Sequence, residues 1–215
     1  MELSIICIAI GIGLVVSLLI YRSSKKKAKE EELLVPFRVF WNDQIEILLN
    51  NHFPLAVIKQ LQLKREKILA IAKELDVPEG HTPFILIIPK KYWDKEYPKR
   101  TGVDVNNIEN IVDTPSEPYA IFDIEDGSKH RGYSPREAQK ILEEEGRSPL
   151  TAEECIMFAQ YVPVLKDHHL NCTGSRCRGD VPGVYLSGGE MPRLNWRSLE
   201  FGGVGWGSPS CRSRH

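Results

Sequence analysis

The side chains best suited to chemistry gather in one stretch of the 215-residue chain, from His168 onward. His168 and His169 are followed by Cys172 and Cys177, and Cys211 comes later. Imidazole and thiolate groups suit Zn²⁺, but zinc needs four such ligands in a tetrahedron. The Cys-x4-Cys spacing is wide for such a site, and adjacent histidines rarely both reach one metal. The pattern therefore favours buried thiols and helix-end histidines, and we expect no metal and no cofactor.

Nucleophilic catalysis is a second hypothesis for the same stretch, with Cys177 or Cys211 as nucleophile and His168 or His169 as base. A reactive thiolate needs a pKa lowered by positive charge or by a neighbouring base. Arginines flank Cys177 and follow Cys211. Neighbouring side chains in an extended segment point to opposite faces, so these arginines can miss the sulfur. A cysteine enzyme is therefore the alternative to a binding function.

Hydroxyl and guanidinium groups offer a third kind of site, an anion-binding pocket. Ser175 and Arg176 lie beside glycine-rich turns, as do Ser210 and Arg212. Such groups hold phosphate or carboxylate. No phosphate-loop or dinucleotide-binding pattern accompanies them. The leading hypothesis is a binding or interaction module of unknown ligand, with its functional surface in this region.

The acidic group Asp123, Glu125 and Asp126 lacks the spacing of a calcium loop, and a strand end followed by an Asp-Gly turn explains it. The formal net charge of −1 gives no support for nucleic-acid binding, where a basic domain is expected. The four tryptophans show no basic interleaving of the kind that stacks on bases, so we expect them in the core or at its rim.

The elements that must position these residues form an α+β pattern. Continuous apolar runs predict strands at residues 84–88 and 119–124, and a hairpin is expected from 184–186 and 193–196. Two capping boxes predict helices that begin after Ser134 and Thr151, the first ending at Gly146. Upstream, an apolar stripe indicates a helix before Pro54, a second from Leu55 and a longer one from Leu63. Helices followed by a small mixed or antiparallel sheet and a loop-rich lobe indicate the α+β class.

Residues 3–21 contain no charged side chain, and a helix of this length spans about 30 Å, the thickness of the hydrocarbon core. Lysines and Arg22 follow this segment, whereas only Met1 and Glu2 precede it. Positive flanks stay in the cytoplasm, so a single-pass signal-anchor in the inner (plasma) membrane, with a cytoplasmic domain, is expected. A cleaved signal peptide would instead have a basic start and a small-residue cleavage site.

The expected organisation is an anchor at residues 1–22, a charged stalk at 23–36 and a soluble domain at 37–215. The lipid bilayer is the expected partner of residues 3–21. Ala9, Gly13 and Ser17 fall four apart on one helical face, a spacing that lets two membrane helices pair. A homodimer through this face is therefore a possible assembly.

Several motifs occur together in one order, and their order is more specific than any one of them. They are Gly146–Thr151 with Glu153 and Glu154, Ser175–Cys177, Val181–Pro182 with Leu186–Ser187, and Trp206–Ser208 with Ser210–Cys211. In this respect residues 37–214 resemble a family of bacterial single-domain proteins of unknown function. The resemblance implies an intracellular domain and assigns no activity, cofactor or partner. The chain departs from the family pattern at residues 197–204, where relatives look richer in Trp, Pro and His.

Overall fold

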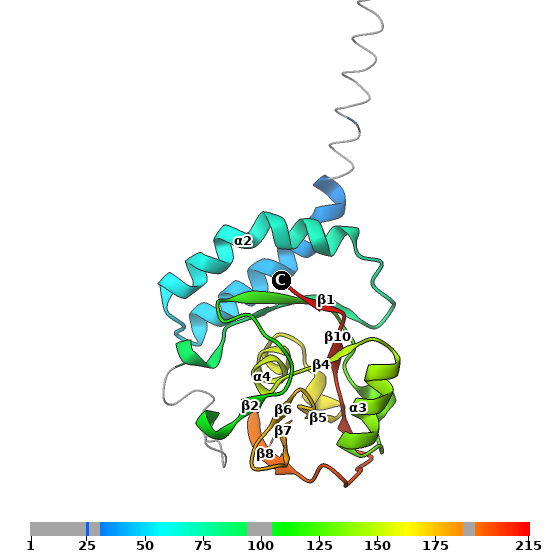
Figure 1. Ribbon diagram of the computed structural model, residues 1–215. Helices are drawn as coiled ribbons and strands as arrows, with labels where there is room; N and C mark the ends of the chain where they lie inside the picture. Colours follow the sequence, from blue (N-terminus) through cyan, green and yellow to red (C-terminus); the bar gives the residue numbers. More distant parts are fainter. Residues whose placement is uncertain (1–24, 26–30, 94–104, 187–191) are drawn as a thin grey trace, which may run out of the picture. The chain divides into compact units, whose positions relative to one another are not determined.

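The computed structural model describes residues 25, 31–93, 105–186 and 192–215. The chain divides into two compact units, Met1–Phe40 and Trp41–His215. Residues 31–40 of the first unit are helical, and Arg38 forms an ion pair with Glu31 there. Residues 41–50 of the second unit are also helical, and the strands that the structure describes belong to this unit (Figure 1).

A three-stranded antiparallel sheet lies at the centre of the second unit. Its order is β1 (Thr82–Ile87), β3 (Tyr119–Ile124) and β11 (Ser213–Arg214). Helix α2 (Leu55–Glu74) packs against β1 and β3 from one side, and helix α4 (Ala152–Tyr161) packs against β1 from the other (Figure 1). Because both faces are covered, β3 is buried along its whole length, which is why its sequence is nearly all apolar.

The outer edge of β1 is closed by a side chain rather than by a fourth strand. Gln44 accepts a hydrogen bond from the Leu86 backbone N–H at 2.8 Å and donates one to the Phe84 carbonyl at 3.4 Å. Trp41, from the same helical stretch, packs its ring 6.3 Å from that of Phe84. An apolar edge strand is thereby protected from pairing with other chains.

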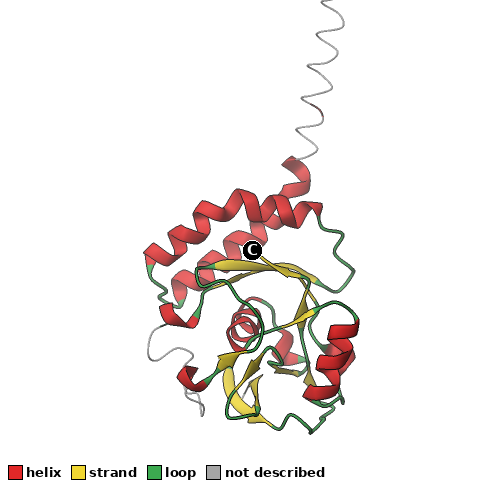
Figure 2. Cartoon of the chain, viewed as in Figure 1, coloured by secondary structure: helices red, strands yellow, loops and turns green. Residues whose placement is uncertain are grey.

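Helix α4 lies between this sheet and a second, four-stranded one (Figure 2). The second sheet has the order β8 (Arg193–Arg197), β7 (Val181–Tyr185), β5 (His169–Asn171) and β9 (Trp206–Gly207), with β5 and β9 parallel. Every residue of α4 from Ala152 to Phe158 is buried, since sheets flank the helix. The predicted hairpin is confirmed, because β7 and β8 pair in register from Val181–Arg197 to Tyr185–Arg193.

Shorter elements connect the two sheets. β2 (Glu109–Asn110) pairs with β6 (Ser175–Arg176), and β4 (Ser148–Pro149) pairs with β10 (Ser210–Cys211). The described residues also form four short 3-10 helices, η1 (Lys90–Tyr92), η2 (Val105–Asn107), η3 (Ser128–His130) and η4 (Val164–Lys166).

Both predicted capping boxes are confirmed. Ser134 and Glu137 close the start of α3 (Pro135–Glu144) by reciprocal hydrogen bonds, and Thr151 and Glu154 do the same for α4. Gly146 ends the α3 region with a φ of 65°, the left-handed conformation expected there. These local signals are strong because each satisfies backbone donors that a helix end leaves unpaired.

Two predictions about helices are wrong. The separate helices expected from Leu55 and Leu63 form one continuous helix, α2, because nothing between them breaks the backbone. The expected membrane-spanning helix is contradicted, since no helix in the described part of the chain is both long and apolar enough to cross a bilayer. Helix α2 has 20 residues but carries charged side chains such as Lys59 and Lys67 along its surface.

Residues 3–21, to which the anchor was assigned, lie outside the described residues, and so do Ala9, Gly13 and Ser17. The predicted signal-anchor and single-pass topology are contradicted together with the membrane-spanning helix. The expected cytoplasmic placement of the domain stays a prediction.

Candidate anion-binding groove

Asp123, a carboxylate inside an apolar strand, is the centre of the candidate site. Its side chain is 2% exposed, and its φ of 50° lies in the left-handed region that strands avoid. Such a conformation costs on the order of 1–3 kcal/mol and tends to occur at functional sites. The carboxylate accepts hydrogen bonds from His81 Nδ1 at 2.5 Å and from Arg147 Nη1 at 3.1 Å. These two partners therefore stabilise a backbone conformation that is unfavourable by itself.

Burial disfavours the charged form of Asp123, but the hydrogen bond from His81 and the charge of Arg147 outweigh it. The pKa of Asp123 therefore lies below its usual value. At neutral pH this site holds an ionised carboxylate that balances the charge of the buried arginine beside it.

Arg147 is held rigidly by several bonds from its guanidinium group. Nη2 donates to the Asp123 carbonyl at 2.5 Å and Nε donates to Ser210 Oγ at 2.8 Å, in addition to the bond from Nη1. Its side chain is only 13% exposed. Arg147 is thus a fixed wall of the site, with its charge matched by Asp123.

Arg212 differs from Arg147 in both exposure and bonding. Its side chain is 55% exposed, and Nε lies 3.9 Å from Asp123 Oδ2, beyond hydrogen-bond distance. The backbone is fixed, because Arg212 N–H donates to the Phe122 carbonyl at 2.9 Å. Among the described residues, the guanidinium has no closer partner, so its hydrogen-bond donors are open to a ligand.

The two arginines line one groove of about 320 Å³. It runs between α3 and the segment that joins β10 to β11, and its volume falls in the range of small-molecule sites. The lining residues are Ile111, Val112, Gln139, Glu143, Gly146, Arg147, Ser148, Pro149 and Arg212.

A second buried ion pair fixes the strand that forms one wall of the groove. Arg214 donates from Nε and Nη2 to the two carboxylate oxygens of Glu154, at 2.7 and 2.9 Å. It also donates to Ser148 Oγ at 2.5 Å and to the Pro149 carbonyl at 2.9 Å. Burial alone would lower the pKa of Arg214, but its bonds to Glu154 raise it above the usual value. The position of β4 therefore depends on Arg214.

Ser175 and Arg176, two of the predicted ligand-binding residues, are used within the protein itself. Ser175 Oγ accepts from the Ala152 N–H at 2.9 Å and donates to Asn110 Oδ1 at 2.8 Å. Arg176 donates to the Thr173 and Ser175 carbonyls and, at 2.5 Å, to Gln139 Oε1. Arg176 thereby fixes the side-chain amide of Gln139, which lines the groove. Ser210, in contrast, accepts a hydrogen bond from Arg147, and Arg212 lies 3.9 Å from Asp123.

The four cysteines in the described part of the chain are buried, and they do not form one reactive group. Cys211 is fully buried, and burial together with the nearby charge of Glu154 raises its pKa to about 12. Cys177 is 2% exposed and lies at a tight turn closed by backbone hydrogen bonds with Asp180. Cys155 and Cys172 are hydrogen-bonded to each other, and burial followed by that bond raises the pKa of Cys155. No group of three or more potential metal ligands is assembled within the described ranges.

The two adjacent histidines have separate structural roles. His168 is buried, and its Nε2 lies 3.0 Å from the Asp126 carbonyl. The ring of His169 packs 4.9 Å from that of Trp206 on the second sheet, and burial lowers the pKa of His169. As neighbours in an extended segment, they point in different directions.

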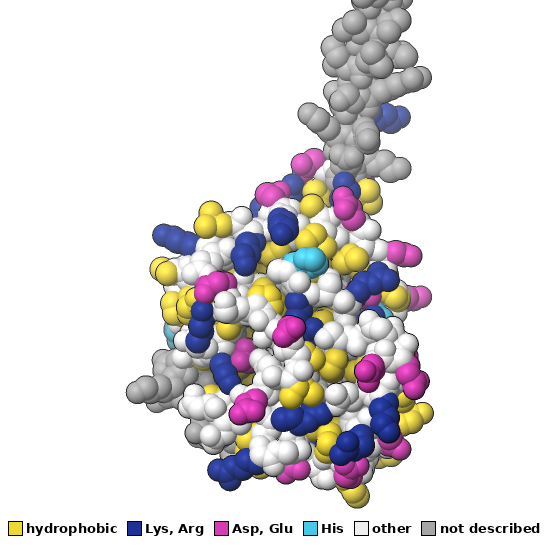
Figure 3. Space-filling view, in the orientation of Figure 1, with side chains coloured by type: hydrophobic (Ala, Val, Ile, Leu, Met, Phe, Trp, Pro, Cys, Tyr) yellow, Lys and Arg dark blue, Asp and Glu magenta, His cyan; other side chains and the backbone are white. Residues whose placement is uncertain are grey.

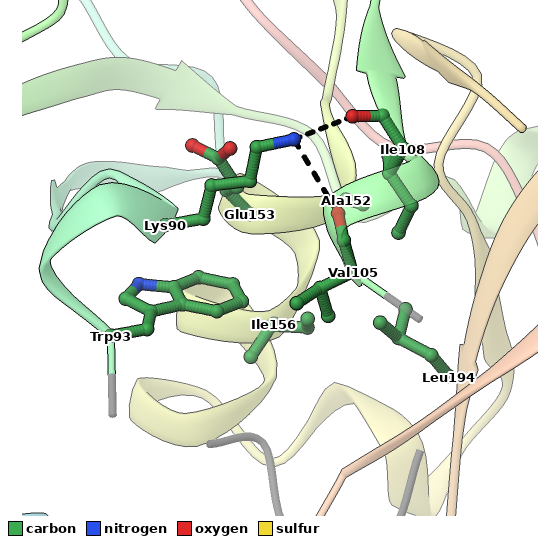
Figure 4. Close-up of a pocket in the computed structure, with 8 residues that line it drawn as sticks. All are labelled: Lys90, Trp93, Val105, Ile108, Ala152, Glu153, Ile156 and Leu194. Carbon is green, nitrogen blue, oxygen red and sulfur yellow. Dashed lines mark hydrogen bonds between the residues drawn. The ribbon is translucent and has the colours of Figure 1, made fainter. Parts of the chain in front are cut away.

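A second cavity, between η1 and α4, is too small for a ligand other than water. Its volume is about 10 Å³, about the space that one water needs. The Lys90 ammonium points to the Ile108 and Val105 carbonyls, at 2.5 and 3.4 Å (Figure 4). Burial raises the pKa of Glu153 despite the nearby charge of Lys90. We assign these residues to packing.

The sequence-based candidates for the site did not include Asp123, His81 or Arg147, the residues whose contacts hold the site together. The acidic group that contains Asp123 is explained in the sequence by a strand end followed by a turn. A carboxylate inside the apolar run Tyr119–Ile124 is nevertheless a signal of its own, because buried acids are almost always paired. His81 lies in a loop before β1, and no local pattern singles it out.

Comparison with known proteins identifies the family. One family model matches residues 52–207, well over half of the chain, and it describes a family of unknown function, DUF5701. The chain belongs to DUF5701. This confirms the resemblance to a single-domain family without an assigned function. No curated protein and no solved structure matches the chain. In this DUF5701 protein, Ser210, Arg212 and Arg214 lie just beyond the matched residues. Arg212 lines the groove, and Ser210 and Arg214 are hydrogen-bonded to the lining residues Arg147 and Ser148.

Proposed function

We propose that this DUF5701 protein is a binding module for a small anionic ligand, which Arg212 contacts in the groove beside α3. The contrast between two arginines carries the proposal. Arg147 is fixed and its charge is matched by Asp123, whereas Arg212 is half exposed and presents its guanidinium at the groove. Guanidinium groups bind carboxylate and phosphate through paired hydrogen bonds.

The rigidity of the groove supports this proposal. Arg214 fixes Ser148, and Arg176 fixes Gln139, so two polar side chains of the lining keep defined positions before any ligand arrives. A site whose walls are already ordered loses less entropy on binding. The strained backbone of Asp123 fits the same interpretation, because strain is retained where a site needs a particular geometry.

The distribution of charge supports a local site rather than a broad electrostatic face. On the face shown in the space-filling view, Lys and Arg side chains are interspersed with Asp and Glu, and neither sign covers this face alone (Figure 3). The net charge of −1 agrees with this mixture. Recognition of an anion therefore depends on one oriented guanidinium rather than on overall charge.

Calorimetric titration of the full chain with inorganic phosphate and with acetate tests the proposal. Arg212→Gln should weaken binding of the preferred anion about tenfold or more, because a charge-assisted hydrogen bond is lost. Arg65→Gln changes a partly exposed arginine on α2 outside the groove lining; it is the matched control and should bind as the wild type does. Equal affinity of the Arg212→Gln protein would exclude this groove as the anion site.

A cysteine nucleophile was the alternative hypothesis from the sequence, and no specific observation favours it. Both candidate sulfurs are buried, and the raised pKa of Cys211 disfavours the thiolate.

A further inference from the structure

The groove presents one charged side chain of each sign that no hydrogen bond to another described residue holds in place: Arg212, whose Nε lies 3.9 Å from Asp123, and Glu143. Arg212 lines it from the β10–β11 segment, and Glu143 lines it from α3. Glu143 is exposed, and its carboxylate has no hydrogen-bond or ion-pair partner among the described residues. Arg147 adds no net charge, because Asp123 balances it.

We infer that the ligand is a small zwitterion with an apolar body, of the kind represented by a free apolar amino acid; this inference rests on the anion-binding function proposed above. A simple anion would be attracted by Arg212 but repelled by Glu143 in the same groove. A molecule that carries both a carboxylate and an ammonium group satisfies both side chains. Glu143, which would repel a simple anion, then attracts the ammonium group of the ligand.

The apolar part of the ligand is indicated by the remaining lining residues. Ile111, Val112 and Pro149 contribute apolar surface to the same groove, and Ile111 is 45% exposed. An exposed isoleucine beside two charged groups offers a place for an aliphatic side chain that leaves water. The volume of about 320 Å³ accommodates one small molecule, so its two charged ends can contact opposite walls.

Four probes test the inference by titration calorimetry on the full chain. L-Leucine carries both charges, 4-methylpentanoate lacks the ammonium, 3-methylbutylamine lacks the carboxylate, and inorganic phosphate is a simple anion. We expect leucine to bind most tightly and each molecule with one charge removed to bind about tenfold more weakly, since each loses one charge-assisted contact.

Two variants of α3 give a matched comparison. Glu143→Gln should weaken leucine binding about tenfold and leave 4-methylpentanoate binding unchanged or stronger, because it removes both the attraction for ammonium and the repulsion of carboxylate. Glu144→Gln changes the next exposed residue on the same helix, which does not line the groove, and should have no effect on either probe. Thermal unfolding of both variants verifies that each is folded.

The outcomes separate this inference from the proposed function. If leucine and 4-methylpentanoate bind equally and Glu143→Gln changes neither affinity, the zwitterion inference is overturned, while loss of binding in Arg212→Gln still supports an anion site. If phosphate is the only probe that binds, through Arg212, the ligand is a simple anion. If none of the four binds, both the inference and the proposed function are rejected.

Discussion

Arg214 and Glu154 form a two-point salt bridge that joins a strand of the central sheet to the first turn of the helix between the sheets. The Arg214 side chain is 9% exposed and that of Glu154 is fully buried. Glu154 also accepts hydrogen bonds from the Tyr119 hydroxyl and from the Thr151 N–H. One carboxylate therefore ties together a strand, a helix start and the segment that carries the groove.

Removal of one partner from this pair should be strongly destabilising. We expect Arg214→Met to lower the free energy of unfolding by about 3–5 kcal/mol, because Glu154 would be left buried without its counter-ion. Adding Glu154→Gln to the Arg214→Met variant should restore part of the lost free energy of unfolding. Urea denaturation of the single and double variants measures both effects. Arg136→Met, which removes an exposed ion pair with Glu200, should change stability little; a similar loss there would show that the effect is not specific to the buried pair.

Two glycines with the same backbone conformation should respond differently to alanine. Gly127 and Gly132 have φ values of 89° and 90°, so either substitution strains the backbone by about 1 kcal/mol. At Gly127 an added Cβ would lie 2.5 Å from the Ser208 backbone nitrogen, whereas at Gly132 nothing lies within 4 Å. Gly127→Ala should therefore cost about 1–3 kcal/mol more than Gly132→Ala in chemical denaturation. Equal losses would mean that the Asp126–Gly127 turn can move away from the β9–β10 segment.

The lowered pKa of Asp123 predicts a particular dependence of stability on pH. The stabilisation is fully present above the carboxyl pKa of the unfolded chain, about 3.9, and is lost as the pH falls through the lower folded value. Asp123→Asn should be less stable at pH 7 by about 3 kcal/mol or more and should show a shallower decline between pH 5 and pH 2. Urea midpoints across this range measure the effect. Asp113→Asn, at an exposed position, should follow the wild-type curve, and parallel curves for wild type and Asp123→Asn would contradict the assignment.

Cys211 should resist alkylation in the folded protein. With its pKa raised to about 12 from a usual 9, its thiolate fraction at pH 8 falls about a thousandfold below that of the unfolded chain. Mass spectrometry after brief iodoacetamide treatment should find Cys211 unmodified in native protein and modified in urea. Because folding favours the neutral thiol, the contribution of Cys211 to the free energy of unfolding is present below pH 9. This contribution is lost as the pH rises towards 12. Rapid alkylation of Cys211 near neutral pH would instead support the hypothesis that it acts as a nucleophile.

The elements that sequence predicted well are those whose signals are local. The apolar runs of β1 and β3 and the capping boxes at Ser134 and Thr151 each identify a structure from neighbouring residues alone. The pairing of β11 with β3 and of β10 with β4 was missed, because strands of two residues carry no periodicity. Their partners are set by the tertiary fold, which short-range patterns do not encode.

The candidate site shows the same difference between what local sequence predicts and what only the tertiary fold determines. Arg212 and Ser210 were proposed from their chemical type, and the structure places both beside the Asp123–Arg147 pair. Arg176 and Ser175 have the same chemical type, yet their polar groups bond to the protein itself. Only the three-dimensional structure distinguishes a guanidinium that holds the fold from one that faces a groove.

The three-stranded sheet has a consequence for synthesis of the protein. The central strand β3 gains its second neighbour only from residues 213–214, which are translated long after Tyr119–Ile124. While the chain is still emerging from the ribosome, β3 has an open edge made of apolar residues, with no side chain like Gln44 to cover it. We expect this interval to be the time when nascent chains are most prone to associate with one another, so slower translation of the final strands would raise the demand for chaperones.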